Sequence, residues 1–169
     1  MRILGISSAT KVISIGLLDE DKVLIETTVS DIRAEKILFY VNEAGIKPEE
    51  IEAVAVAIGP GSYVGLRGGL ATAKSLAQTL DIPLVAVSTL EAIAYNLADI
   101  EGTMAVILDA KSDEYNIALF GAHKGKLKRL TEDMVLRFDK VRDSLSRISG
   151  DIWVVGNIKG IKGIEAGNF

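Results

Sequence analysis

The chain has 169 residues, 49% of them apolar and 25% charged, a composition typical of a folded globular protein. It has no cysteine and one histidine, His123, which excludes disulfide scaffolds, cysteine nucleophiles and metal sites built from thiolates or several histidines. The net charge is −4 and no long run of Lys or Arg occurs, so any nucleic acid is expected to come through a partner. Without a signal segment or an apolar run of membrane-spanning length, we expect a cytoplasmic protein.

The first half of the chain predicts an antiparallel meander followed by helices and strands in alternation. Ile- and Val-rich segments mark the strands, and apolar residues at helical spacing mark the helices. In chain order the expected elements are strands at 2–6, 12–18 and 23–29, a helix at 33–44, a helical turn at 49–51, a strand at 53–58, a helix at 63–80, a strand at 84–87, and a helix that is capped by Ser88 or Thr89 and ends at 97.

The second half predicts the same order of elements. The expected elements are strands at 104–108, 115–120 and 127–135, a turn at 109–114, a weak helix at 139–147 and a strand at 152–155. Because three strands, a helix and a strand thus occur twice, we expect a duplicated α/β fold with lobes at 1–100 and 101–169. The second lobe is expected to be incomplete, since a Gly-rich segment follows Val155.

A glycine-rich loop over residues 59–67 joins the buried strand to the second helix. Its two glycines around Pro60 allow a tight reversal, and Ser62 is placed to cap the helix. The loop lacks the Gly-Lys-Ser/Thr ending of a phosphate-binding P-loop, the glycine spacing of a dinucleotide site and the G-x-S-x-G pattern of a nucleophile elbow. As plain structure, it is a strand-to-helix turn.

The complete loop resembles one family closely. It reads Gly59-Pro60-Gly61-Ser62-Tyr63-Val64-Gly65-Leu66-Arg67, and the TsaB (YeaZ) family has Gly-Pro-Gly-Ser-(Phe/Tyr)-Thr-Gly-(Leu/Val)-Arg. The resemblance extends to segments 3–10, 83–90, 109–111 and 114–115, and therefore covers residues 1–120. It implies the ribonuclease-H-like, actin-like fold of two duplicated lobes.

The resemblance also implies a function. Proteins of this family are non-catalytic subunits that pair with the catalytic paralogue TsaD and with the ATPase TsaE, and the complex adds threonylcarbamoyl to an adenosine next to the anticodon of tRNA. We therefore expect no cofactor, contact with tRNA only through the complex, and a homodimer when the chain is alone. The catalytic paralogues need helix-borne histidines for a metal, and this chain has none, so no metal site is expected.

An actin-like ATPase needs an acidic residue at the end of its first strand to organise magnesium. This chain has Ser7 there, and Asp109 stands alone at the equivalent place in the second half. A vestigial nucleotide cleft would contain Ser7, Ser8, Thr10 and Asp109. An ATP-dependent kinase or ATPase of the same fold is the alternative function, and a self-associating structural protein is a third.

The second helix carries a stripe of small residues, which suggests a close contact with another helix. Its members are Gly65, Gly69, Ala73 and Ala77, with Leu66 and Leu70 alongside. Packing on the protein's own sheet or first helix is the competing explanation. Because the resemblance implies pairing through helices of the first lobe, we expect the stripe to form the partner surface together with Ile37 and Val41 of the first helix.

Overall fold

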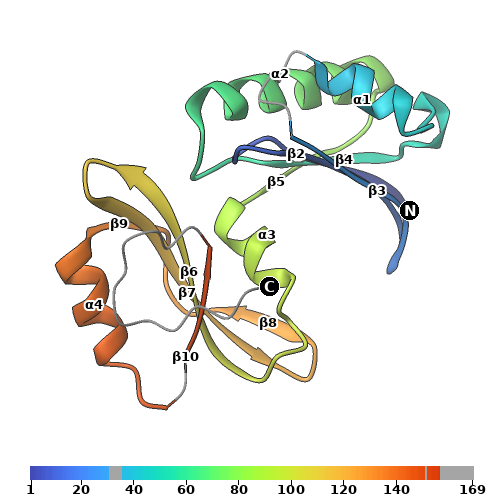
Figure 1. Ribbon diagram of the computed structural model, residues 1–169. Coiled ribbons are helices and arrows are strands. Elements are labelled where there is room, and N and C mark those ends of the chain that lie inside the picture. Colours follow the sequence, from blue (N-terminus) through green and yellow to red (C-terminus); the bar gives the residue numbers. More distant parts are fainter. Residues whose placement is uncertain (31–35, 151, 157–169) are drawn as a thin grey trace. The chain divides into compact units, whose positions relative to one another are not determined.

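The computed structural model describes residues 1–30, 36–150 and 152–156 (Figure 1). The chain divides into two compact units, residues 1–89 and 90–169. None of the helices in the described part is long and apolar enough to cross a membrane. Each unit has its own sheet and its own core.

Unit 1 contains a five-stranded sheet in the order β3-β2-β1-β4-β5. Its elements are β1 (Arg2–Ser7), β2 (Ile13–Asp19), β3 (Lys22–Val29), α1 (Ile37–Glu43), the 3₁₀ turn η2 (Pro48–Glu50), β4 (Ala53–Ala57), α2 (Tyr63–Leu80) and β5 (Leu84–Val87). The first three strands are antiparallel, whereas β1, β4 and β5 run parallel. Helices α1 and α2 lie together on one face of this sheet (Figure 1).

The core of unit 1 lies between that sheet face and the two helices. Leu4 pairs with both Leu17 and Val54, so three neighbouring strands present apolar side chains at one level. Ile37 of α1 and Ala73 of α2, both fully buried, complete the same cluster. This arrangement follows from strand periodicity, because alternate residues of a strand point to the same face.

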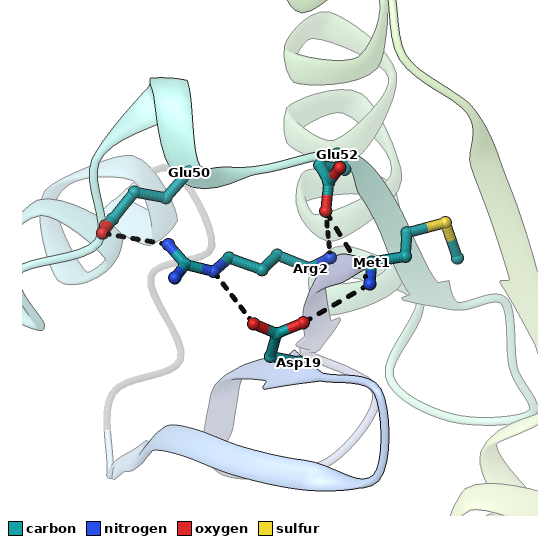
Figure 2. Close-up of polar contacts among 5 residues, drawn as sticks. All are labelled: Met1, Arg2, Asp19, Glu50 and Glu52. Atoms are coloured by element: carbon teal, nitrogen blue, oxygen red, sulfur yellow. Dashed lines mark hydrogen bonds and ion pairs between the residues drawn. The ribbon is translucent and has the colours of Figure 1, made fainter.

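An ion cluster holds the beginning of β1 (Figure 2). The Met1 ammonium lies 3.4 Å from Asp19 Oδ1 and 3.9 Å from Glu52 Oε2. The Arg2 side chain reaches Asp19 (3.3 Å) and Glu50 (3.4 Å), and its main-chain N–H donates to Glu52 (2.6 Å). Hydrogen bonds from Arg2 and from the Met1 ammonium lower the pKa of Asp19. The cluster thus links β1 to the end of β2 and to the segment before β4.

Unit 2 contains a sheet in the order β10-β6-β7-β8, with β9 also paired to β7. Its elements are β6 (Gly102–Lys111), β7 (Glu114–His123), β8 (Lys126–Arg129), β9 (Met134–Arg137), α4 (Phe138–Ser146) and β10 (Ile152–Gly156), preceded by α3 (Thr89–Tyr95). Strand β6 is antiparallel to β7 and parallel to β10.

The two faces of β6 serve two separate clusters. Met104 and Val106 pack with Leu90 of α3, whereas Ala105 and Ile107 pack with Val141 of α4. All of these residues are fully buried. A central strand covered on both faces is expected to be a continuous apolar run, as β6 is.

The expected duplication is present in the strand order. In each unit the first strand, β1 or β6, lies between an antiparallel second strand and a parallel strand that follows a helix. The fold class is therefore confirmed as duplicated α/β. The strand expected at 127–135 is instead two strands, β8 and β9, which pair with opposite ends of β7.

Three other expectations changed or lie outside the description. The units divide at Thr89, earlier than the boundary expected at residue 100, because α3 packs on the second sheet. The expected turn at 109–114 is mostly strand, and β6 and β7 meet in a tight hairpin turn at Ser112 and Asp113. The beginning of the first expected helix, 33–35, and the Gly-rich segment after Gly156 lie outside the described residues.

Candidate functional site

The glycine-rich loop connects the end of β4 to the start of α2. Gly59 has a φ of 114°, a backbone conformation that favours glycine, and the Gly59–Pro60 peptide bond is cis. Ser62 caps α2 as the sequence predicts, because its hydroxyl accepts a hydrogen bond from the Gly65 main-chain N–H at 3.3 Å. The Gly59 carbonyl accepts a hydrogen bond from the Thr89 N–H at 2.7 Å, which joins the loop to the end of β5.

The glycines allow the loop and α2 to approach the turn after β1. The Ser62 N–H donates to the Ala9 carbonyl at 2.7 Å, and a Cβ on Gly61 would collide with that same carbonyl. A Cβ on Gly65 would collide with the carbonyl of Ser8, and one on Gly69 with the Ser8 hydroxyl. The glycine spacing of this motif is therefore explained by backbone contact with the β1–β2 turn.

Ser8 is the centre of this contact. It is 3% exposed, and its hydroxyl donates to the Gly65 carbonyl at 2.8 Å. A buried hydroxyl requires such a partner, since an unpaired one costs roughly 1–3 kcal/mol. Ser8 is thus a positioning residue for the first turns of α2.

The prediction that the small residues of α2 form a partner surface is wrong. Gly65, Gly69, Ala73 and Ala77 are buried within unit 1, where α2 packs on β4 and β1. Ile37 and Val41 are also buried, in the core shared by the sheet and both helices. Leu66 and Leu70 are half-buried. The competing explanation, packing on the protein's own sheet, is correct for this stripe.

The helices of unit 1 expose a different set of apolar residues. Leu38 and Phe39 of α1 are 50% and 55% exposed, and Tyr63 and Val64 at the start of α2 are 73% and 71% exposed. Arg67 lies over the Tyr63 ring, with 5.4 Å from its guanidinium carbon to the ring centroid. We call these five residues the outer helical surface. In the sequence, this surface was indicated by the two apolar residues at 38–39, which directly follow the buried Ile37.

The expected cleft residues fall into two groups. Ser7 ends β1, Ser8 packs under α2, and Thr10 is an exposed turn residue, so these three lie together in unit 1. Asp109 belongs to unit 2, where its carboxylate accepts a hydrogen bond from the Lys111 N–H at 2.9 Å. Within the described residues, no three His, Asp or Glu side chains come together as metal ligands would.

His123 is exposed at the end of β7, as its place in a predicted turn suggests. Its Nδ1 lies 2.6 Å from Glu101 Oε2, and the other Glu101 oxygen accepts a hydrogen bond from the Lys124 N–H at 2.7 Å. The Lys124 N–H and then His123 lower the pKa of the Glu101 carboxyl. This pair fixes the tip of the β7–β8 hairpin.

The chain is similar in sequence to known proteins. Residues 33–150 match the family described as "TsaD: tRNA N6-adenosine threonylcarbamoyltransferase". The Bacillus subtilis "tRNA threonylcarbamoyladenosine biosynthesis protein TsaB" is 34% identical over 139 residues, which are 79% of this chain and 61% of that protein. The Escherichia coli protein of the same name is 29% identical over 164 residues, which are 92% of this chain and 71% of that protein.

Two solved structures from Pseudomonas aeruginosa are also similar. One is described as an uncharacterized protein with similarity to peptidase YEAZ (TM-score 0.75, 25% identity). The superposed region is 92% of this chain and 74% of that chain. The other is YeaZ (TM-score 0.70, 26% identity), and the superposed region is 80% of this chain and 67% of that chain.

The duplicated strand order and the loop packed on the β1–β2 turn define a duplicated α/β protein with the fold of the YeaZ structures. Within that class the chain belongs to the TsaB/YeaZ family, as its relatives and its match to the TsaD-type family over residues 33–150 show. The chain spans 61% of the length of the Bacillus subtilis relative.

Proposed function

We propose that this chain is a non-catalytic subunit of the machinery that adds threonylcarbamoyl to adenosine next to the anticodon of tRNA. In this proposal it acts in the cytoplasm, pairs with and activates a TsaD-like catalytic paralogue, and works with a TsaE-like ATPase. The observation that carries the proposal is the family match, because relatives along most of the chain are named for tRNA threonylcarbamoyladenosine biosynthesis.

The chemistry of the residues expected at a nucleotide cleft supports a non-catalytic role. Ser7 provides a hydroxyl where an actin-like ATPase needs a carboxylate for magnesium. The Asp109 carboxylate accepts a main-chain hydrogen bond within its own hairpin. Ser8 is committed to the Gly65 carbonyl. These contacts favour the subunit role over the alternative of an ATP-dependent enzyme.

The outer helical surface is suited to pairing with the paralogue. Tyr, Phe and Arg are enriched at protein interfaces, and a few such residues near the centre usually contribute most of the binding free energy. The exposed Phe39 and the stacked Tyr63 and Arg67 are residues of this kind. In this proposal the same surface forms a homodimer when the paralogue is absent.

Co-purification with a tagged TsaD-like paralogue tests the proposal. We expect the wild-type chain to be retained. When tRNA is incubated with the paralogue, the TsaE-like ATPase and an activated threonylcarbamoyl donor, we expect it to gain the mass of threonylcarbamoyl only if the chain is also present. Phe39→Ser and Tyr63→Ser should each weaken retention at least tenfold, about 1.4 kcal/mol. Val135→Ser, which changes an exposed apolar residue of unit 2, is the matched control.

Each result bears on a different part of the proposal. A wild-type chain that neither binds the paralogue nor supports modification would overturn the proposed function. If the wild-type chain binds and both surface variants bind as well as it does, the function stands and the pairing surface lies elsewhere. Circular dichroism of each variant shows whether a loss of binding reflects a loss of folding.

A further inference from the structure

The hairpin that joins β7 to β8 has a tight and regular geometry. Its two turn residues, Lys124 and Gly125, have φ angles of 50° and 71°. Two successive residues with positive φ define the turn type that favours a right-twisted hairpin. His123 pairs with Lys126 directly beside the turn. The positions of the hairpin side chains are therefore fixed by strand register.

The hairpin has one apolar and one basic face. Phe120, Ala122 and Leu127 belong to the core cluster beneath it. Lys126 and Lys128 alternate with Leu127 and are exposed on the opposite face, and Lys124 is exposed at the tip. Within residues 123–129 four of seven residues are Lys or Arg and none is acidic, although the whole chain has a net charge of −4. We call Lys124, Lys126 and Lys128 the basic hairpin.

The lysines of the basic hairpin form no ion pair among the residues that the structure describes. In the described part of unit 2, none of these three ammonium groups lies within ion-pair distance of a carboxylate. Arg129 differs, because its guanidinium pairs with Glu91 (3.1 Å) and Asp133 (2.6 Å).

Two acidic residues, Glu101 and Asp99, lie near the tip of the hairpin. Glu101 binds the Lys124 N–H and His123. Asp99 lies where it would contact a Cβ on Gly125. The Glu101 carboxylate holds the turn in place. Both carboxylates reduce the positive potential at the tip, but neither forms an ion pair with the lysines on β8 in the part of the chain that the structure describes.

We infer that the basic hairpin contacts the phosphate backbone of the tRNA, an inference that rests on the proposed function. Lys126 and Lys128 are two residues apart on one strand, or about 6.6 Å, a spacing comparable to that of neighbouring phosphates in a nucleotide chain. An acidic protein partner fits less well, because lysine is depleted at protein interfaces. Three phosphate contacts on an acidic chain give weak binding alone, so the hairpin acts within the assembled complex.

The test measures tRNA binding by the complex of the chain with its TsaD-like paralogue. In the test variant, Lys124→Asn, Lys126→Thr and Lys128→Thr are combined, because Asn tolerates the positive φ and Thr suits a strand. We expect the slope of log K against log salt to become shallower by about 2 to 3, roughly one unit for each lost phosphate contact. The matched control combines Lys22→Thr, Lys140→Gln and Arg142→Gln, which removes the same charge elsewhere and should leave the slope unchanged.

A second variant separates charge from hairpin structure. Glu101→Gln keeps an oxygen that can accept from the Lys124 N–H and removes one negative charge beside the tip. If the hairpin contacts phosphate, this variant should bind tRNA more tightly. If the hairpin is only structural, it should bind equally or more weakly.

The outcomes distinguish this inference from the proposed function. A complex that forms and modifies tRNA, but whose salt slope is unchanged in the triple variant, overturns the hairpin contact and leaves the function intact. An equal loss in the control variant also overturns it, because the effect is then one of total charge. If no complex forms, the proposed function fails. The hairpin contact then fails with it, unless the chain alone binds tRNA in a salt-dependent way that the triple variant loses.

Discussion

The Ser8 hydroxyl donates a hydrogen bond to the Gly65 carbonyl at 2.8 Å, in the first turn of α2. The two residues are 57 positions apart, and their contact brings the end of β1 against the glycine-rich loop. A larger residue at 61, 65 or 69 would collide with this turn. The glycines of the family motif therefore serve first to pack α2 against the β1–β2 turn.

Gly69→Ala should destabilise unit 1 by about 1–3 kcal/mol, because its new methyl group collides with the Ser8 hydroxyl. The sign of the stability change tests the collision, because Gly→Ala in a helix interior otherwise stabilises a protein by roughly 1 kcal/mol. Urea unfolding of the single variants and of the Ser8→Ala/Gly69→Ala double variant measures the coupling. We expect the double variant to be more stable than the sum of the single changes predicts. If the free-energy changes of the two single variants simply add in the double variant, the contact between Ser8 and position 69 is contradicted.

Asp19 should make stability depend on pH in the acid range. Its pKa is lowered in the folded protein by hydrogen bonds from Arg2 and the Met1 ammonium, so its contribution is complete above the pKa of the unfolded chain. That contribution is lost as the pH falls through the folded pKa. We expect the urea midpoint of Asp19→Asn to lie below wild type at neutral pH and to converge with it in acid.

Glu26→Gln is the control for this pH dependence, because Glu26 is an exposed carboxylate with no ion pair in the described part of the chain. Its urea midpoint should follow the wild type at every pH. A gap between Asp19→Asn and wild type that stays constant down to strong acid would show that the ion cluster does not cause the difference.

Thr89→Val should leave stability unchanged or raise it by about 1 kcal/mol. Thr89 is 2% exposed and its hydroxyl has no hydrogen-bond partner among the described residues, so replacing that hydroxyl by a methyl group removes a buried unpaired polar atom. Thr89→Ser keeps the hydroxyl, loses the methyl group and should be less stable than wild type. Thermal unfolding of the two variants checks the order. A clearly destabilised Thr89→Val would mean that the hydroxyl has a partner in solution.

The isolated chain should not hydrolyse ATP in the presence of magnesium. Ser7 cannot bind a metal as a carboxylate does, and the Asp109 carboxylate caps its own hairpin turn. A phosphate-release assay on the purified chain and on Asp109→Ala checks this. Turnover of about one per second, an ordinary enzyme rate, with its loss in Asp109→Ala, would favour the alternative enzyme function.

Local patterns in the sequence determined most of the elements. The expected helix at 63–80 matches α2, and the strand at 84–87 matches β5. These bounds were predictable because capping by Ser62, strand periodicity and proline position act over a few residues. The duplicated order of strands was also readable, since it depends only on the sequence of elements.

Tertiary structure decided which part of the protein each helix face and strand packs against. A stripe of small residues on a helix looks the same whether it packs on a second protein or on its own chain, and only the position of Ser8 beneath Gly69 settles the question here. The strand expected at 127–135 is broken because the N–H groups of Leu130 and Thr131 both donate to the Leu119 carbonyl on β7. Contacts of this kind join residues distant in sequence, and no local pattern of apolar residues specifies them.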